Sequence, residues 1–162
     1  MAKDHLATYL SDHAAGAVAA IDMLKHLEAN HRDTDLAKFA ADLKKDVEAD
    51  HQELEGLIKN LDISEGRTRK AVAWLAEKFT DLKLRWDDSS DGPLRLLEVF
   101  EALALGISGK RYLWLSLDFA KQDTPALNGI DYQRLIARAE EQRSRVERMR
   151  LHAAKAALVF ND

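Results

Sequence analysis

Apolar residues recur at three- and four-residue steps along four long stretches of the chain, which is the spacing of amphipathic helices. The first stretch runs from about residue 3 to 30 and the second from about 34 to 61, with Asp33 or Thr34 as the N-cap of the second. Only residues 31–34 separate them. So short a connection predicts that the two helices pack antiparallel as a hairpin.

The second half of the chain repeats this arrangement. Helices are predicted over about 93–121 and 130–160, joined by the segment 122–128. Between the two pairs lies a shorter amphipathic segment, about 68–86, which at ~1.5 Å per residue spans close to 30 Å and can carry the chain back along the bundle. Two hairpins joined by one long crossover resemble the wiring of a ferritin-like bundle.

The predicted fold is therefore all-α: one ferritin-like four-helix-bundle domain over residues 1–162, with an additional helix in the long crossover between the second and third bundle helices. The polar stretch 87–93 ends that crossover, with Asp91 as the N-cap of the next helix and Pro93 in its first turn.

The predicted helix 93–121 is apolar on nearly all sides. One side carries Leu96, Val99, Leu103, Ile107 and Trp114. The other side carries Leu94, Leu97, Leu105, Tyr112 and Phe119. A helix with this pattern is expected to be buried on both sides. One side would face the bundle core and the other would pack on the crossover helix or on a second copy of the chain, which favours a homodimer.

Composition narrows the function classes. The 162 residues are 46% hydrophobic and 32% charged, with two prolines and no cysteine, as expected of a helical protein without disulfides or thiolate metal sites. A net charge of −4 argues against a nucleic-acid partner, which would need a surplus of Lys and Arg. The polar start, and the lack of any run near ~20 apolar residues, predict a cytoplasmic protein with no membrane partner.

Ferritin-like oxidases hold two metal ions in the middle of the bundle, using glutamates and Glu-x-x-His pairs, and this ligand set suits iron or manganese. The chain resembles them at Glu48-Ala49-Asp50-His51, near the middle of the second helix. At ~100° per residue, Glu48 lies about 120° from the centre of the apolar stripe, Asp50 lies almost on it and His51 lies on its flank. The candidate metal ligands are therefore Glu48, Asp50 and His51, with His13 and Glu101 from other helices.

His13 occupies the centre of the apolar stripe on the first helix, and counting back from the turn places it opposite Asp50. Two interpretations follow. In the first, which we favour, His13 and Asp50 hydrogen-bond to each other because buried polar groups need partners. In the second, they form a metal or catalytic pair to which Asp12 or His51 adds ligands.

The second hairpin departs from the ferritin-like ligand set. The helix 130–160 has no Glu-x-x-His, because Met149 stands three residues before His152. Arg143 and Arg150 border its apolar stripe, where a guanidinium can reach Glu101. Arginine is a poor neighbour for a divalent cation and a good partner for a stranded carboxylate.

The segment Tyr9-Leu10-Ser11-Asp12-His13-Ala14-Ala15-Gly16-Ala17, continuing to Ile21 and Leu24, is similar to the first helix of a group of uncharacterised bacterial ferritin-like proteins. The resemblance implies a ferritin-like bundle that is often dimeric. Two functions follow: a binding or structural module with a degraded di-metal site, or a di-iron or manganese oxidoreductase or iron-handling protein with an unusual ligand set.

Overall fold

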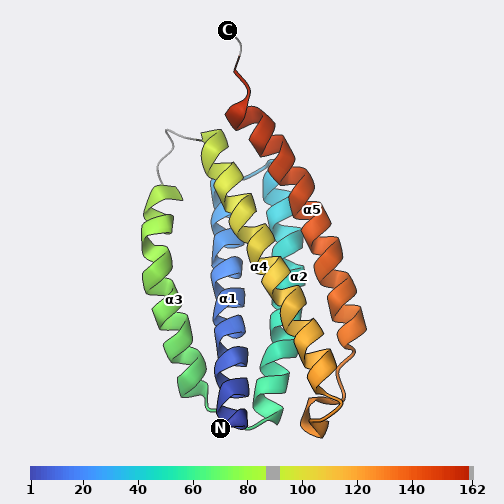
Figure 1. Ribbon diagram of the computed structural model, residues 1–162. Coiled ribbons are helices and arrows are strands. Elements are labelled where there is room, and N and C mark those ends of the chain that lie inside the picture. Colours follow the sequence, from blue (N-terminus) through green and yellow to red (C-terminus); the bar gives the residue numbers. More distant parts are fainter. Residues whose placement is uncertain (87–91, 161–162) are drawn as a thin grey trace. The chain divides into compact units, whose positions relative to one another are not determined.

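The computed structural model describes residues 1–86 and 92–160, the side chains of 81–86 excepted. Every regular element in that part of the chain is helical, which confirms the all-α prediction (Figure 1). In chain order the elements are α1 (Ala2–Asn30), α2 (Asp35–Asn60), α3 (Glu65–Trp86), α4 (Gly92–Ala120), the short 3-10 helix η2 (Pro125–Leu127) and α5 (Tyr132–Leu158). Among the predicted helix starts, that of the crossover helix at residue 68 differs most from the observed start, which is Glu65. The predicted cap Asp91 lies outside the described residues.

The chain forms two compact units, Met1–Lys78 and Phe79–Asp162, with the boundary inside α3. Each unit is built around one pair of helices. The ferritin-like arrangement, and the role of α3 as a crossover within it, depend on how the units are placed and therefore stay predictions.

In the first unit, α1 and α2 run antiparallel side by side (Figure 1). Thr34 caps α2: its Oγ1 accepts a hydrogen bond from the Ala37 N–H at 3.2 Å and donates one to the His31 carbonyl at 2.5 Å. This cap confirms the predicted turn at 31–34. Pairing of the two apolar stripes buries a core that includes Leu10, Ala14, Leu24, Ala40, Leu43 and Leu54.

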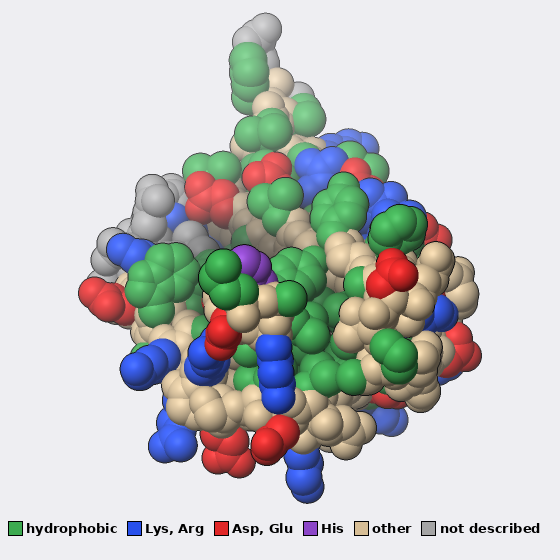
Figure 2. All heavy atoms as spheres, turned by 60° about the horizontal axis from the view of Figure 1, so that its bottom comes forward, with side chains coloured by type: hydrophobic (Ala, Val, Ile, Leu, Met, Phe, Trp, Pro, Cys, Tyr) green, Lys and Arg blue, Asp and Glu red, His purple; other side chains and the backbone are tan. Residues whose placement is uncertain are grey.

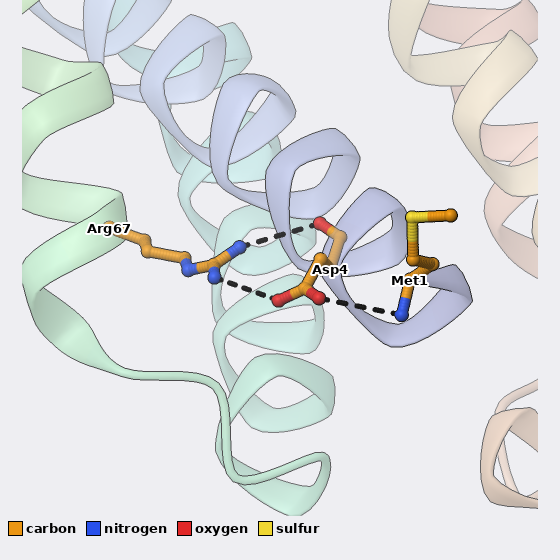
Figure 3. Close-up of polar contacts among 3 residues, drawn as sticks. All are labelled: Met1, Asp4 and Arg67. Carbon is orange, nitrogen blue, oxygen red and sulfur yellow. Dashed lines mark hydrogen bonds and ion pairs between the residues drawn. The ribbon is translucent and has the colours of Figure 1, made fainter.

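The start of α3 is held against α1 by polar contacts (Figure 3). The Arg67 guanidinium reaches from α3 to α1, where Nη2 donates to Asp4 Oδ1 at 2.9 Å and Nη1 donates to the Asp4 carbonyl at 3.4 Å. The N-terminal amine of Met1 lies 3.6 Å from Asp4 Oδ2. Two turns further along α1, the Ser11 hydroxyl lies 3.4 Å from the hydroxyl of Thr68, the residue after Arg67 on α3. These contacts fix the position of α3 where it leaves the loop after α2.

In the second unit, α4 and α5 run antiparallel (Figure 1). Tyr132 closes the connection between them, because its buried hydroxyl donates to the Leu127 carbonyl at 2.7 Å. Its ring lies 6.3 Å from that of buried Trp114. Gly129 has a φ of 96°, a left-handed conformation that a side chain would strain, and Asp131 then caps α5 through the Arg134 N–H at 3.0 Å.

Within the second unit, α4 is buried on one of its two apolar sides, and burial of the other side against the crossover helix or a second copy stays a prediction. Leu103 and Trp114 are buried, whereas Leu105 is 75% exposed, Tyr112 62% and Phe119 77%. We call these last three residues the α4 stripe. In the second unit α5 packs along α4 and covers only the side turned toward it. Hydrophobic side chains also reach the surface between charged ones on the face drawn in Figure 2.

Candidate functional site

The five candidate metal ligands are divided between the two units. His13 lies on α1, and Glu48, Asp50 and His51 lie on α2, all in the first unit. Glu101 lies on α4 in the second unit. Their role as metal ligands stays a prediction.

Asp50 is a charged residue buried within the apolar core of the first unit. Its side chain is 1% exposed, and it lies on the same face of α2 as buried Val47 and Leu54. The structure thus confirms that Asp50 occupies a position where an apolar residue is expected. Burying a carboxylate is costly unless other groups compensate it, so residues at such positions are often functional.

Burial of the His13 side chain disfavours its charged form. Burial lowers its pKa below the ordinary value of 6.5, and the exposed carboxylate of Asp12 only partly opposes this shift. The ring packs edge-on against Tyr9, with the ring centroids 4.7 Å apart. The predicted pairing of His13 with Asp50 stays a prediction.

His51 is held by an acidic residue one helical turn away. Its Nε2 lies 3.1 Å from Glu55 Oε1, and its side chain is only 14% exposed. The other ring nitrogen, Nδ1, is buried and has no hydrogen-bond partner among the described residues. The i, i+4 spacing of His51 and Glu55 is the sequence signal for this pair. An imidazole fixed through one nitrogen keeps the other for a ligand or a proton.

A cleft of about 730 Å³ opens beside this pair, wholly within the first unit. One face of α2, the loop after it and one face of α3 form its walls, and Val18 comes from α1. Its apolar lining is Val18, Ile58, Ile63 and Val72. Its polar lining is His51, Glu55, Lys59, Asp62, Ser64, Glu65, Thr68 and Arg69. The cleft therefore offers apolar walls together with groups of both charges, which suits an amphipathic small molecule.

The sequence builds this cleft from residues on single helix faces. Positions 51, 55 and 58 share one face of α2, and positions 65, 68 and 72 share one face of α3. Between the helices, the Ile63 N–H donates to the Ile58 carbonyl at 3.2 Å, and Asp62 adopts a left-handed φ of 55°. This turn reverses the chain and sets the two faces against each other.

In the second unit, Arg150 contacts two carboxylates. Its Nη1 lies 3.8 Å from Glu101 Oε1, as the prediction that it reaches Glu101 requires. It also binds Glu147 through two hydrogen bonds, from Nε at 2.8 Å and from Nη2 at 2.7 Å. The Arg150 guanidinium lowers the pKa of the Glu147 carboxyl, since it stabilises the charged form. Glu101 is half exposed, so this pair lies near the surface of the unit.

A second hollow lies between the two helices of this unit. This α4–α5 groove has a volume of about 540 Å³. Its lining is Ala104, Leu105 and Ser108 from α4 and Arg143, Ser144 and Glu147 from α5. Because Leu105 belongs to both features, the groove and the α4 stripe adjoin.

The described residues contain neither a cluster of metal-binding side chains nor a helix that could span a membrane. Over residues 1–80 and 92–160, no three His, Asp or Glu side chains gather in a way that would hold a metal ion. Across the same residues, no helix combines the length and apolar character needed to cross a membrane. No protein-family model, curated protein or solved structure matches the chain.

Proposed function

We propose that this chain is a ferritin-like helical-bundle protein that acts as a binding module and carries a degraded di-metal site. The cleft beside His51 is the observation that carries the proposal. It combines an apolar lining with the half-buried His51–Glu55 pair, and its volume of about 730 Å³ is in the range of small-molecule sites.

The charge pairs of the second unit support the degraded metal site. Glu101 is the carboxylate closest to the one that ferritin-like oxidases carry on their third helix, and Arg150 lies beside it at 3.8 Å. A fixed guanidinium repels a divalent cation and stabilises the carboxylate in its place.

An amphipathic fluorescent probe tests the binding site. The probe is 1-anilinonaphthalene-8-sulfonate, which has an apolar ring system and an anionic group. We expect saturable fluorescence enhancement that Val72→Trp, which fills the cleft, reduces at least fivefold. Ala73→Trp is the matched control, because Ala73 is exposed on the same helix and does not line the cleft. Equal binding by both variants would disprove the site.

A second candidate function is a di-iron or manganese oxidoreductase or iron-handling protein. The burial of Asp50 beside His51 favours it, because carboxylate and imidazole are ligands that suit iron and manganese. Metal analysis of the purified protein, followed by addition of Fe²⁺ or Mn²⁺ in a melting assay, separates the two functions. The binding-module proposal expects no stoichiometric metal and an unchanged melting temperature. Near-stoichiometric metal that His51→Ala and Glu101→Ala sharply reduce would establish the metalloprotein instead.

We further propose that the protein is a cytoplasmic homodimer with neither a nucleic-acid nor a membrane partner. The α4 stripe supports dimerisation, because large contiguous apolar surfaces mark interaction sites. Sedimentation equilibrium over a range of micromolar concentrations tests the oligomeric state. A single species of monomer mass up to 100 µM would overturn the dimer.

A further inference from the structure

We propose that the cleft beside His51 takes up a single-chain amphiphile with a zwitterionic phosphodiester head, in which an apolar tail is followed by an anionic phosphate and then by a terminal ammonium group. This inference rests on the proposed function, since it names the class of ligand for the same cleft. It uses only residues of the first unit.

Each wall of the cleft mouth carries two unpaired charges of opposite sign. Lys59 and Asp62 lie on the wall formed by α2 and the loop after it. Glu65 and Arg69 lie on the wall formed by α3. All four side chains are exposed, and none forms an ion pair with another side chain in the described part of the chain. Even Glu65 and Arg69 stay apart, although their i, i+4 spacing allows pairing, so these charges are available to a ligand.

The charges follow a fixed order along the cleft. α2 ends and α3 begins at the same end of the first unit, and the two helices are antiparallel (Figure 1). Asp62 and Glu65 flank the loop between them, so both carboxylates lie at that end of the cleft. Lys59 lies three residues before Asp62, and Arg69 lies four residues after Glu65. Both cations therefore lie about 5–6 Å further along the cleft.

Beyond the two cations the walls become apolar. Val72 lies three residues past Arg69 on α3. On α1, the Ser11 hydroxyl lies 3.4 Å from that of Thr68, and Val18 follows Ser11 by two helical turns in the direction in which α3 also runs (Figure 1). Val18 and Val72 therefore form an apolar section that begins where the charges end.

A molecule with the order tail, phosphate, ammonium matches this cleft. Its terminal ammonium lies between Asp62 and Glu65. Its phosphate lies between Lys59 and Arg69, and a guanidinium can form two parallel hydrogen bonds to phosphate oxygens. Its tail covers the apolar section. In the opposite order, with the ammonium next to the tail, each ligand charge would meet like charges, which repel.

Two amphiphiles with the same decyl tail test the order of the charges. Decylphosphocholine carries its anion next to the tail, whereas decyl sulfobetaine carries its ammonium next to the tail and its anion at the end. Isothermal titration calorimetry below their micelle concentrations should show that decylphosphocholine binds at least about fivefold more tightly, because it gains attraction at both charges, each on the scale of an exposed ion pair. Equal binding, or tighter binding of the sulfobetaine, would overturn the inference.

Charge variants locate the head group. Arg69→Gln and Glu65→Gln should each weaken decylphosphocholine binding about threefold. Lys70→Gln and Glu77→Gln are the matched controls, because they remove the same charges from exposed positions of α3 that do not line the cleft. The controls should leave binding unchanged. If the cleft variants weaken binding no more than their controls, the head group lies elsewhere and the inference fails.

Vesicles of phosphatidylcholine present the same head group on a membrane surface. Because the tail of the ligand must enter the cleft, the protein should stay in the supernatant when the vesicles are sedimented. Cosedimentation that Arg69→Gln reduces would mean that these charges bind a bilayer, and it would overturn the uptake of single molecules.

Binding of 1-anilinonaphthalene-8-sulfonate separates failure of this inference from failure of the proposed function. If Val72→Trp and Ala73→Trp bind this probe equally, the cleft is not a binding site and both proposals fail. If Val72→Trp alone loses the probe while the two amphiphiles bind equally, the cleft remains the site and only the ligand class is wrong.

Discussion

Leu103 and Leu105 offer a matched test of the α4 packing. They are two residues apart on the same helix and lose the same atoms on mutation to alanine, yet Leu103 is 2% exposed and Leu105 is 75% exposed. Any difference between the two variants therefore reports burial. We expect Leu103→Ala to reduce the free energy of unfolding by about 3–4 kcal/mol, because it combines the lost transfer free energy with an internal cavity.

Leu105→Ala should change the free energy of unfolding of the monomer by less than about 0.5 kcal/mol. It removes a side chain that is mostly in water already, and alanine is at least as good a helix former as leucine. If the proposed homodimer forms through the α4 stripe, the same mutation also removes contact area between the copies. It should therefore weaken the dependence of stability on protein concentration, which dimerisation produces by mass action.

Urea denaturation followed by circular dichroism measures both effects. With a slope of about 2 kcal/mol per molar urea, Leu103→Ala should lower the midpoint by roughly 1.5–2 M at a concentration where the protein is monomeric. Leu105→Ala should leave that midpoint nearly unchanged. Equal losses at the two positions, or a loss above ~1.5 kcal/mol for monomeric Leu105→Ala, would refute the packing of α4 described above.

Three further predictions concern single contacts. Because burial lowers the pKa of His13 below 6.5, the unfolded chain binds a proton at His13 more readily than the folded chain does. The free energy of unfolding should therefore fall as pH drops below about 6.5. Measured over the same pH series, His13→Gln should show a shallower fall. Burial raises the pKa of Tyr132 to about 12, so the free energy of unfolding should fall as pH rises above 10.0. An absorbance titration should show Tyr132 as the last tyrosine to ionise. At pH 7, calorimetry should show that Tyr132→Phe costs about 1 kcal/mol, because the hydrogen bond to the Leu127 carbonyl is lost. Arg67→Ala removes a pair in which Arg67 and Asp4 are 45% and 65% exposed, so a urea titration should show a loss below about 1 kcal/mol. A larger loss would mean that water does not screen this pair as its exposure implies.

Helix positions and their boundaries could be predicted from local pattern. The turn at 31–34 with its Thr34 cap and the burial of Asp50 both follow from residue spacing along a single helix. Periodicity reports which residues share a helix face, and short connections report which helices are neighbours. Both are properties of a few consecutive turns.

The cleft beside His51 could not be predicted in the same way. Its lining comes from three helices and a loop, and Val72 and Val18 are far apart in the sequence. Only the docking of α3 on α1, through Arg67 and Thr68, brings them to one place. A pattern within one helix contains no information about which other helix faces it.

The α4 stripe shows most clearly which properties local sequence determines and which depend on tertiary packing. By itself, the sequence determined that 92–120 is helical and that apolar residues occupy both of its sides, since propensity and periodicity act locally along the backbone. Only the tertiary structure decided that α5 covers Leu103 and leaves Leu105 in water. Burial is a property of the space between elements, and one helix can cover only one face of another.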